Sequence, residues 1–473
     1  MIPPRLEEPP RSPWKGLLVV GAILGALVLW RAIAGRDPEV VKPAAGASAS
    51  VSDEPSPRAP ALPRCSEIAD PFLVGDAPAK PPSVDPPEPG QPAEEPDDPT
   101  SPFAAEVGRG ALFDGGFVVG AKRQGEGGAV AMVATLGLDG KDGKLVRVAR
   151  LRGDLDPPVV AGAGRAIIAV MIEPNAGGRA LRVAKVEGDR VTLGPELSEG
   201  RDDSLAIDVA ASAQRAVVVW DDLTAQGKRS AIMLASIDVA TMRVTAPARP
   251  ITAEGQDAER PRLIARPGGF WLSYAVRGSA TKKKSDKHRR ADEEDDRELG
   301  EAITTTWVEL VPLDESGSPV GASRAVTAKS GHVLAYDIEA VDDGGALIVW
   351  RDDDTPTGSG GGRLLATVAR LSGVAEAKLL AEETSAAGVP ELIPGWLALA
   401  SVNGGTRIAA LSPRGELLDE LEPEKSLGAG VPAAATREVI LWARPLGKAM
   451  RLSVLRCAPR AALSPDGGAA DGG

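Results

Sequence analysis

Short apolar runs recur seven times along this chain at intervals of about fifty residues. They occupy residues 117–119, 166–170, 216–220, 270–274, 346–350, 396–400 and 439–443. Their starting points are 49, 50, 54, 76, 50 and 43 residues apart, and the one long step contains a highly charged insert. A period of this size in short strands indicates a ring or an array, because one four-stranded unit cannot bury its faces alone.

Each repeat has room for four short strands joined by turns. In the third repeat we expect strands at 205–211, 216–220, 231–237 and 242–251, and in the fifth at 335–341, 346–350, 364–371 and 377–380. The second strand is almost continuously apolar, as is typical of a strand covered on both faces. The runs of β-branched residues suit twisted sheets, so the predicted fold class is all-β.

Residues 103–458 resemble a seven-bladed β-propeller of four-stranded blades. The resemblance is carried by the spacing and by the runs Val-Val-Trp-Asp-Asp at 218–222 and Ile-Val-Trp-Arg-Asp at 348–352. It extends to the architecture and to no specific family, since the single Trp-Asp dipeptide lacks the Gly-His partner of WD40 repeats. Six or eight blades remain alternatives, because the end repeats are the least regular.

The chain also carries a candidate membrane anchor. Residues 16–30 are uncharged and apolar, and a helix over 16–34 would span roughly 30 Å, the thickness of a hydrocarbon core. We predict an uncleaved anchor there, after an N-terminal tail at 1–15. A cleavable signal peptide is the alternative, although Arg31 falls inside the would-be cleavage region. With either an anchor or a signal peptide, the chain after this segment would be exported. We therefore expect a bacterial cell membrane protein with its propeller in the periplasm or outside the cell.

The only two cysteines, Cys65 and Cys457, lie at the two ends of the repeat region. A ring brings its ends together, so we predict a disulfide between them, and two free thiols are the alternative. Such a bond fits an exported compartment. Residues 35–102 form a Pro/Ala-rich linker, predicted to be disordered apart from a closing strand near 65–75, and residues 459–473 a disordered tail.

Composition argues against several functions. The net charge of −12 disfavours nucleic acid as a partner, because phosphate binding needs a cationic surface. His288 and His332 are the only histidines, one in the charged insert and one before a strand. So placed, they make no zinc site and no evident Ser/His/Asp arrangement. We therefore predict no catalytic residue, no metal site and no cofactor.

The connections between second and third strands emerge on one rim of a propeller, and here they are polar. We expect any binding on that rim, since loops on a rigid scaffold often carry function. The candidate binding residues there are Asp221, Asp222, Arg351, Asp352, Asp353, Asp354 and Arg444. Their acidic members could hold Ca²⁺, but consecutive carboxylates point apart, and ordinary solvated turns are the alternative.

These observations predict a non-catalytic, envelope-anchored propeller that binds a protein or a glycan through one loop rim. Its predicted partners are the membrane, through residues 16–34, and that ligand. One alternative is a propeller hydrolase or lyase acting on carbohydrate, which carboxylates converging on the rim or in the central channel would favour. Another is a structural or assembly factor of an envelope complex, which a large exposed apolar patch would favour.

Overall fold

The computed structural model describes residues 64–75, 105–125, 128–151, 156–175, 178–200, 206–224, 229–279, 303–358, 361–383, 389–400, 406–423 and 430–458. The predicted anchor at 16–34, the tails at 1–15 and 459–473 and most of the linker lie outside these residues. Within the described ranges, no helix has the length and apolar character needed to cross a membrane.

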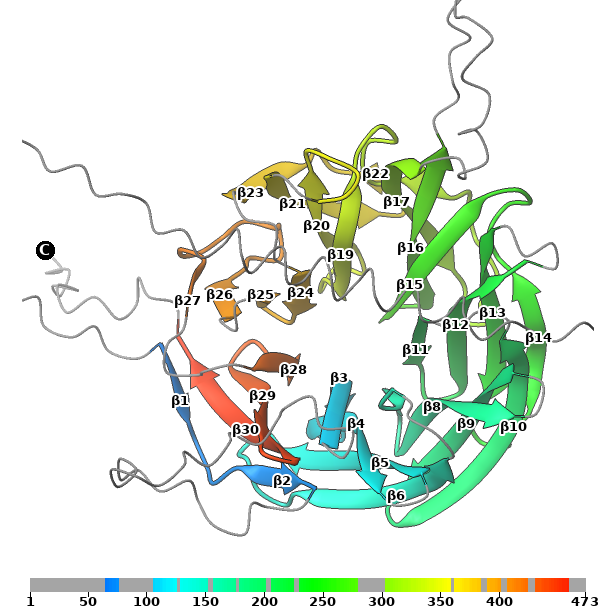
Figure 1. Ribbon diagram of the computed structural model, residues 1–473, viewed down its shortest axis with the longest axis vertical. Helices are drawn as coiled ribbons and strands as arrows, with labels where there is room; N and C mark the ends of the chain where they lie inside the picture. Colours follow the sequence, from blue (N-terminus) through cyan, green and yellow to red (C-terminus); the bar gives the residue numbers. More distant parts are fainter. Residues whose placement is uncertain are drawn as a thin grey trace, which may run out of the picture. The chain divides into compact units, whose positions relative to one another are not determined.

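Seven antiparallel sheets surround a central axis, which confirms the seven-bladed propeller (Figure 1). Blade 1 holds β3 (Ala105–Phe113), β4 (Gly116–Gly125), β5 (Gly128–Gly137) and β6 (Lys144–Leu151). Blade 2 holds β7 (Val159–Ala163), β8 (Ala166–Asn175), β9 (Gly178–Glu187) and β10 (Arg190–Gly200). Blade 3 holds β11 (Ile207–Ala211), β12 (Arg215–Leu223), β13 (Ser230–Asp238) and β14 (Val244–Pro250). Blade 4 holds β15 (Asp257–Arg266), β16 (Gly269–Ser279), β17 (Ile303–Leu313) and β18 (Arg324–Ala325).

The remaining three blades continue the ring. Blade 5 holds β19 (Val333–Ala340), β20 (Ala346–Asp353), β21 (Gly362–Arg370), β22 (Gly373–Val374) and β23 (Lys378–Glu383). Blade 6 holds β24 (Val389–Ile393), β25 (Trp396–Ala400), β26 (Thr406–Ala410) and β27 (Glu422–Pro423). Blade 7 holds β28 (Val431–Ala435), β29 (Val439–Leu446) and β30 (Ala449–Cys457). Its outer edge is completed by β1 (Cys65–Glu67) and β2 (Phe72–Val74), which both pair with β30.

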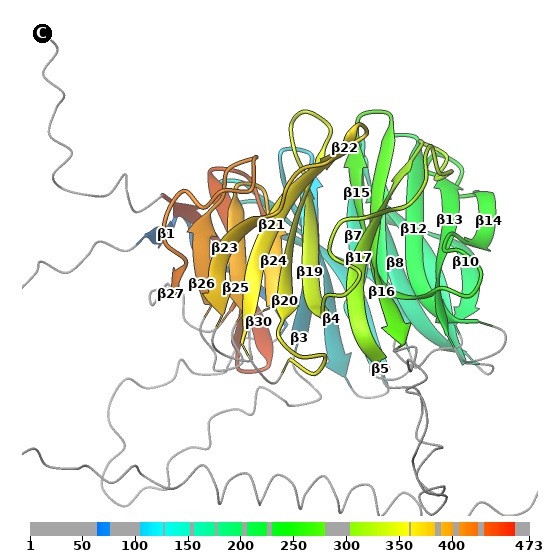
Figure 2. The same cartoon turned by 90° about the horizontal axis from the view of Figure 1, so that it is seen from above.

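The first strand of each blade lines the centre of the ring. Each of these innermost strands contacts the innermost strand of the next blade, and β28 contacts β3 to complete the circle (Figure 1). Seen edge-on, the strands run along the ring axis (Figure 2). Side chains from seven different blades therefore face one shared channel.

The core lies between neighbouring blades. One cluster joins Val133 of blade 1, Ile168 of blade 2 and Val218 of blade 3. The strand β12 is buried continuously from Ala216 to Asp222, as expected for a second strand covered on both faces. Because aromatic residues make up only 3% of the chain, these interfaces consist mostly of Val, Ile, Leu and Ala.

The two ends of the ring are joined covalently. Cys65 of β1 lies opposite Cys457 of β30, and their sulfurs form a disulfide, which confirms that prediction. Arg64 adds a polar contact to blade 6, since its guanidinium donates to the Ile408 carbonyl at 2.6 Å and pairs with Asp419. Blade 7 thus combines strands from both ends of the repeat region, which removes an open sheet edge.

The second strands extend further than the apolar runs predicted. Asp221 and Asp222 lie inside β12, residues 351–353 lie inside β20, and Arg444 lies inside β29, whereas all were expected in loops. The loop assignment of these residues was wrong because an apolar run marks only the part of a strand covered by apolar neighbours. The hydrogen-bond ladder with the third strand continues beyond it, since the polar side chains find partners there.

Candidate functional site

Irregular pairing on the innermost strands directs side chains into the channel. Register shifts occur between Val107 and Gly110 on β3, Glu259 and Arg262 on β15, Val333 and Ala335 on β19, and Pro432 and Ala434 on β28. A bulge of this kind bends a strand and re-aims its side chains. The residues within these shifts, among them Arg109, Arg260, Leu334 and Ala433, all line cavities of the channel.

The larger cavity, which we call the mouth cavity, has a volume of about 350 Å³. It is formed by the N-terminal parts of the innermost strands. Its walls are mainly aliphatic, and its polar side chains are those of Asp156, Arg260, Arg262 and Tyr336. Because Ile207 pairs with Trp220, the start of each innermost strand lies beside the end of the second strand. The mouth cavity is therefore at the rim of the second-to-third connections, where we expected binding.

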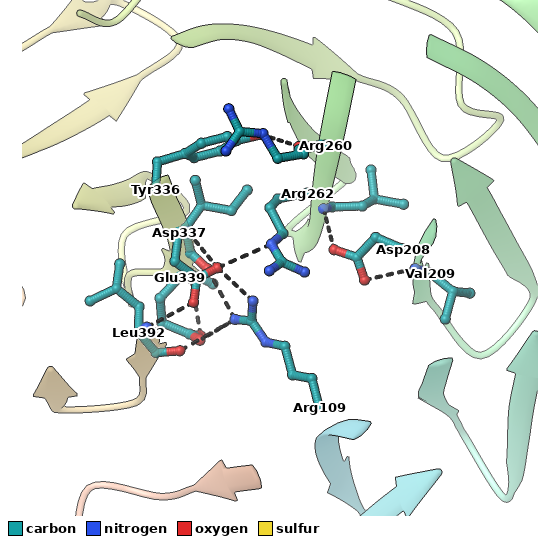
Figure 3. A network of polar contacts seen from close by, with 12 residues as sticks. Arg109, Asp208, Val209, Arg260, Arg262, Tyr336, Asp337, Glu339 and Leu392 are labelled. Atoms are coloured by element: carbon teal, nitrogen blue, oxygen red, sulfur yellow. Dashed lines mark hydrogen bonds and ion pairs between the residues drawn. The ribbon is translucent and has the colours of Figure 1, made fainter. Parts of the chain in front are cut away.

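Beneath the mouth cavity lies a layer of charged side chains, the channel belt, formed by Arg109, Asp208, Arg262 and Asp337 (Figure 3). Arg109 Nη1 donates to Asp337 Oδ1 at 2.5 Å, and Arg262 Nε lies 3.6 Å from the same oxygen. Two guanidinium groups from different blades thus share one carboxylate. Their side chains remain 32% and 38% exposed, so both reach the channel solvent.

Three residues of the channel belt occupy equivalent positions in successive blades. Asp208, Arg262 and Asp337 lie opposite Val219, Ser273 and Val349, each of which directly precedes a buried aromatic residue. The aspartates also connect blades. Asp208 Oδ2 accepts the Leu263 N–H at 2.7 Å, and Asp337 Oδ2 accepts the Leu392 N–H at 2.7 Å. Each carboxylate therefore binds the innermost strand of the following blade.

The shared channel shifts the pKa values of its acids. Burial raises the pKa of Asp208 against the opposing effect of the arginines. Burial also raises the pKa of Glu339 and of Glu391 to about 7, and for both the nearby charge of Asp337 adds to the increase. Burial by itself would lower the pKa of Arg109, but the negative charges of the carboxylates around it have a larger opposite effect. The pKa of Arg109 therefore lies above the ordinary value.

A second cavity, of about 300 Å³, lies on the other side of the channel belt. It is lined by the C-terminal parts of the innermost strands, and Arg109, Asp208 and Glu339 are its charged residues. The charged lining of the mouth cavity thus consists of two arginines and Asp156, whereas two carboxyl groups and one arginine line the second cavity.

Arg260 gives the mouth cavity its shape. This residue has a φ of 54°, a backbone angle that residues other than glycine rarely adopt. Its N–H donates to Asp221 Oδ2 at 2.8 Å, and its carbonyl accepts the Tyr336 hydroxyl at 2.5 Å. Its guanidinium donates to the carbonyl of Leu334. Asp221 also accepts the Ala206 N–H at 2.7 Å, so this candidate residue positions the lining of the cavity from behind.

The candidate residues of blade 5 have partners within the protein. Arg351 Nε donates to Asp353 Oδ1 at 2.8 Å, and only 5% and 1% of these two side chains are exposed. Burial raises the pKa of Asp353. Asp352 accepts the His332 N–H at 3.0 Å. Asp354 is exposed, and its N–H donates to the Gly361 carbonyl at 3.0 Å.

The structure does not bring the candidate residues together around one ligand. Asp222 is buried in β12, and Arg444 is half-buried in β29, opposite Arg451. None of the candidate residues lines the mouth cavity, although Asp221 supports it. In the part of the chain that the structure describes, no group of three or more His, Cys, Asp or Glu side chains is arranged to hold a metal ion.

The residues of the channel belt were not predicted from the sequence. A signal for two of them was present, because Leu-Ala-x-Asp occurs at 205–208 and again at 334–337. The match places Asp208 and Asp337 at one position of the repeat, where a carboxylate interrupts a buried strand. No comparable signal points to Arg109 or Glu391.

No protein-family model and no curated protein sequence matches this chain. Among solved structures, it is similar to polysaccharide lyase Uly1, with a TM-score of 0.46 and 9% identity over 75% of this chain and 89% of that one. It is also similar to uncomplexed acylaminoacyl peptidase from Pyrococcus horikoshii, with a TM-score of 0.43 and 12% identity over 78% of this chain and 55% of that one. The β-propeller domain of the Trilobed protease from Pyrococcus furiosus gives a TM-score of 0.41 and 9% identity, over 75% and 95%. At these values the likeness says nothing about activity.

Proposed function

We propose that this protein is a non-catalytic β-propeller that binds a protein or a glycan at the rim of the second-to-third connections. The mouth cavity supports this proposal. It has the volume of a small ligand site, combines aliphatic walls with two arginines, and is shaped by a bulge held by hydrogen bonds. A strained backbone fixed by its surroundings is typical of a preformed binding site.

The proposal places the propeller in a bacterial envelope, anchored through residues 16–34. Two observations support this location. The apolar run at 16–30 has the length of a membrane span. The disulfide between Cys65 and Cys457 belongs to a type of bond that persists in oxidising, exported compartments.

Photo-crosslinking of the full-length protein in its native cells tests the binding site. A benzophenone side chain at Ala335, which lines the mouth cavity, should give a discrete adduct that mass spectrometry identifies. The same side chain at Ala213, which is exposed in the turn at the opposite end of blade 3, should not give that adduct. Identical adducts from both positions, or none from Ala335, would contradict binding at the mouth.

A carbohydrate hydrolase or lyase remains the second candidate, and the channel carboxyl groups favour it. A carboxylic acid with a pKa near 7 is suited to proton transfer at neutral pH, and Glu339 and Glu391 both meet that condition. Assays of the full-length protein on neutral and acidic polysaccharides test this function. Cleavage that is lost in Glu391→Gln would support an enzyme, and unchanged cleavage in that variant would exclude this residue as its acid.

A further inference from the structure

The mouth cavity combines an aliphatic wall with guanidinium groups at its base. Val159, Ile172, Ile207, Leu334 and Val389 contribute apolar surface from blades 2, 3, 5 and 6. A polar ligand such as a sugar would leave hydroxyl groups without partners against these walls, which is costly. The walls therefore favour a ligand with an aliphatic part.

Arg262 is the donor best placed to meet that ligand. It lines the mouth cavity and, at the channel belt, it also lines the smaller cavity beside Asp337. Its Nε faces Asp337 at 3.6 Å, Asp208 is a second carboxyl group near it, and 38% of its side chain is exposed. A partly exposed guanidinium is suited to bidentate pairing with a carboxylate.

The charges around Arg262 leave room for an added anion. Arg109 and Arg262 share the carboxylate of Asp337, and burial raises the pKa of Asp208, the other carboxyl group of the channel belt. The pKa values of about 7 leave Glu339 and Glu391 partly neutral near pH 7. Arg260 adds a further guanidinium at the wall of the mouth cavity, where it pairs with Glu259 at 3.3 Å. The lining of the mouth cavity thus holds two guanidinium groups and one carboxylate, that of the exposed Asp156, so an incoming carboxylate meets an excess of positive charge.

We propose that the mouth cavity binds the free C-terminal carboxylate of a peptide whose last residue is aliphatic. The carboxylate pairs with Arg262 at the base, and the aliphatic side chain packs against the walls. A volume of about 350 Å³ suits the last one or two residues of a chain. This inference rests on the proposed binding function and names its ligand class.

Calorimetric titration of the full-length protein tests the inference directly. The probes are N-acetyl-Leu-Leu with a free C-terminus, the same peptide as its C-terminal amide, and digalacturonic acid. We expect the free acid to bind at least tenfold more tightly than the amide, and 0.5 M salt to weaken the acid more than the amide. The comparison of acid with amide uses the unaltered protein, so it does not depend on any variant folding.

Two substitutions and one control locate the interaction. Arg262→Met should weaken binding of the free acid at least tenfold. Arg215→Met is the matched control, because Arg215 pairs with Asp238 at the opposite end of blade 3 and should leave binding unchanged. Ala335→Phe, which fills part of the mouth cavity, should abolish binding of both peptides.

Each contrary result has a distinct meaning. If acid and amide bind equally and Ala335→Phe blocks both, carboxylate recognition is wrong and binding at the mouth cavity stands. Tighter binding of digalacturonic acid than of the peptide acid would overturn the peptide in favour of an acidic sugar. Absence of binding by all three probes would overturn the inference, whereas the crosslinking at Ala335 decides the proposed function independently.

Discussion

Three hydrogen-bond donors and a second guanidinium surround the carboxylate of Asp337. The N–H groups of Ile338 and Leu392 and the Nη1 of Arg109 donate to it, and Arg262 lies 3.6 Å away. A buried carboxylate needs such partners, since an unsatisfied buried charge is expensive. One residue thereby connects blades 1, 4, 5 and 6 across the channel.

Replacing Asp337 should therefore cost much more than replacing an exposed acid. We expect Asp337→Ala to lower the free energy of unfolding by about 3 kcal/mol, because it removes the acceptor of the Leu392 N–H and of Arg109 Nη1. Asp343→Ala is the control, since it removes only an exposed pair with Arg370 and a turn hydrogen bond from the Gly345 N–H, and it should cost clearly less than Asp337→Ala. Urea unfolding measures both, and equal losses would contradict the role assigned to Asp337.

Glu391 should make stability depend on pH. Its pKa rises from the ordinary 4.5 to about 7 on folding, chiefly through burial, so the folded protein holds the proton more tightly than the unfolded chain does. Stability from this group is therefore lost as the pH rises from about 4.5 to about 7. We expect Glu391→Gln to be more stable than the unaltered protein by about 2 kcal/mol at pH 8.5 and similar to it at pH 4.5.

The control for this prediction is Glu376→Gln, because Glu376 is exposed between β22 and β23. It should leave the free energy of unfolding nearly unchanged at both pH values. Chemical denaturation of the three proteins at pH 4.5 and 8.5 provides the measurement. A Glu391→Gln variant whose stability tracks the unaltered protein at both pH values would show that the charge of Glu391 has no energetic cost.

At the scale of the element, the bulge on β15 is the feature that makes a binding surface. Regular pairing would alternate the side chains of β15 between its two faces. The shift between Glu259 and Arg262 instead places residues 260–262 together in the lining of the mouth cavity. Asp221 at the end of β12 and Tyr336 of β19 hold this geometry from the two neighbouring blades.

Loss of Asp221 should loosen this bulge. Asp221→Ala removes the acceptor of the Ala206 and Arg260 N–H groups, and we expect it to lower the free energy of unfolding by about 2 kcal/mol. Hydrogen exchange of the Arg260 amide should accelerate by at least tenfold, because the positive φ costs about 1–3 kcal/mol when it is no longer held. Asp221→Asn, which keeps one oxygen acceptor, should show a smaller change in both measurements. Unchanged exchange in Asp221→Ala would contradict this account.

At the scale of the whole molecule, the ring is closed by three different means. The strands β1 and β2 pair with β30, the disulfide joins residues 392 positions apart, and Arg64 reaches blade 6. The guanidinium of Arg64 also lies 5.2 Å from the ring of Trp396, a cation–π arrangement. The outer edge of the last blade pairs with strands from the start of the described chain. Loss of this pairing would open the ring, and every blade is packed between two neighbours of that ring.

Removing the disulfide should destabilise the ring while leaving its strands able to pair. For a loop this long, the chain-entropy estimate is roughly 6 kcal/mol. We expect Cys65→Ser with Cys457→Ser to lower the Tm by about 5 °C or more in scanning calorimetry. Limited proteolysis should then cleave first near β1, β2 and β30, since β1 is only three residues long. A Tm unchanged by the double substitution would mean that strand pairing alone closes the ring.

Several features of this fold were predictable because they depend on local burial. Apolar runs such as 216–220 and 346–350 repeat along the chain, and each became the buried second strand of a blade. Cys65 and Cys457 were predictable as partners because a ring must bring its ends together. The ends of the second strands were not predictable, since Asp221 and Asp353 are polar and yet buried, Asp221 by hydrogen bonds from Ala206 and Arg260 and Asp353 by its pair with Arg351.

The sequence by itself predicted a ring of about seven four-stranded blades, because the buried second strand of each blade recurs as an apolar run, and it pointed to the two cysteines as the place of closure. Only the tertiary structure decided the channel. Arg109, Asp208, Arg262 and Asp337 come from four blades and meet only when the ring is closed. Which charges face one another depends on ring geometry and on bulges in the innermost strands, and neither leaves a periodic signal in the sequence.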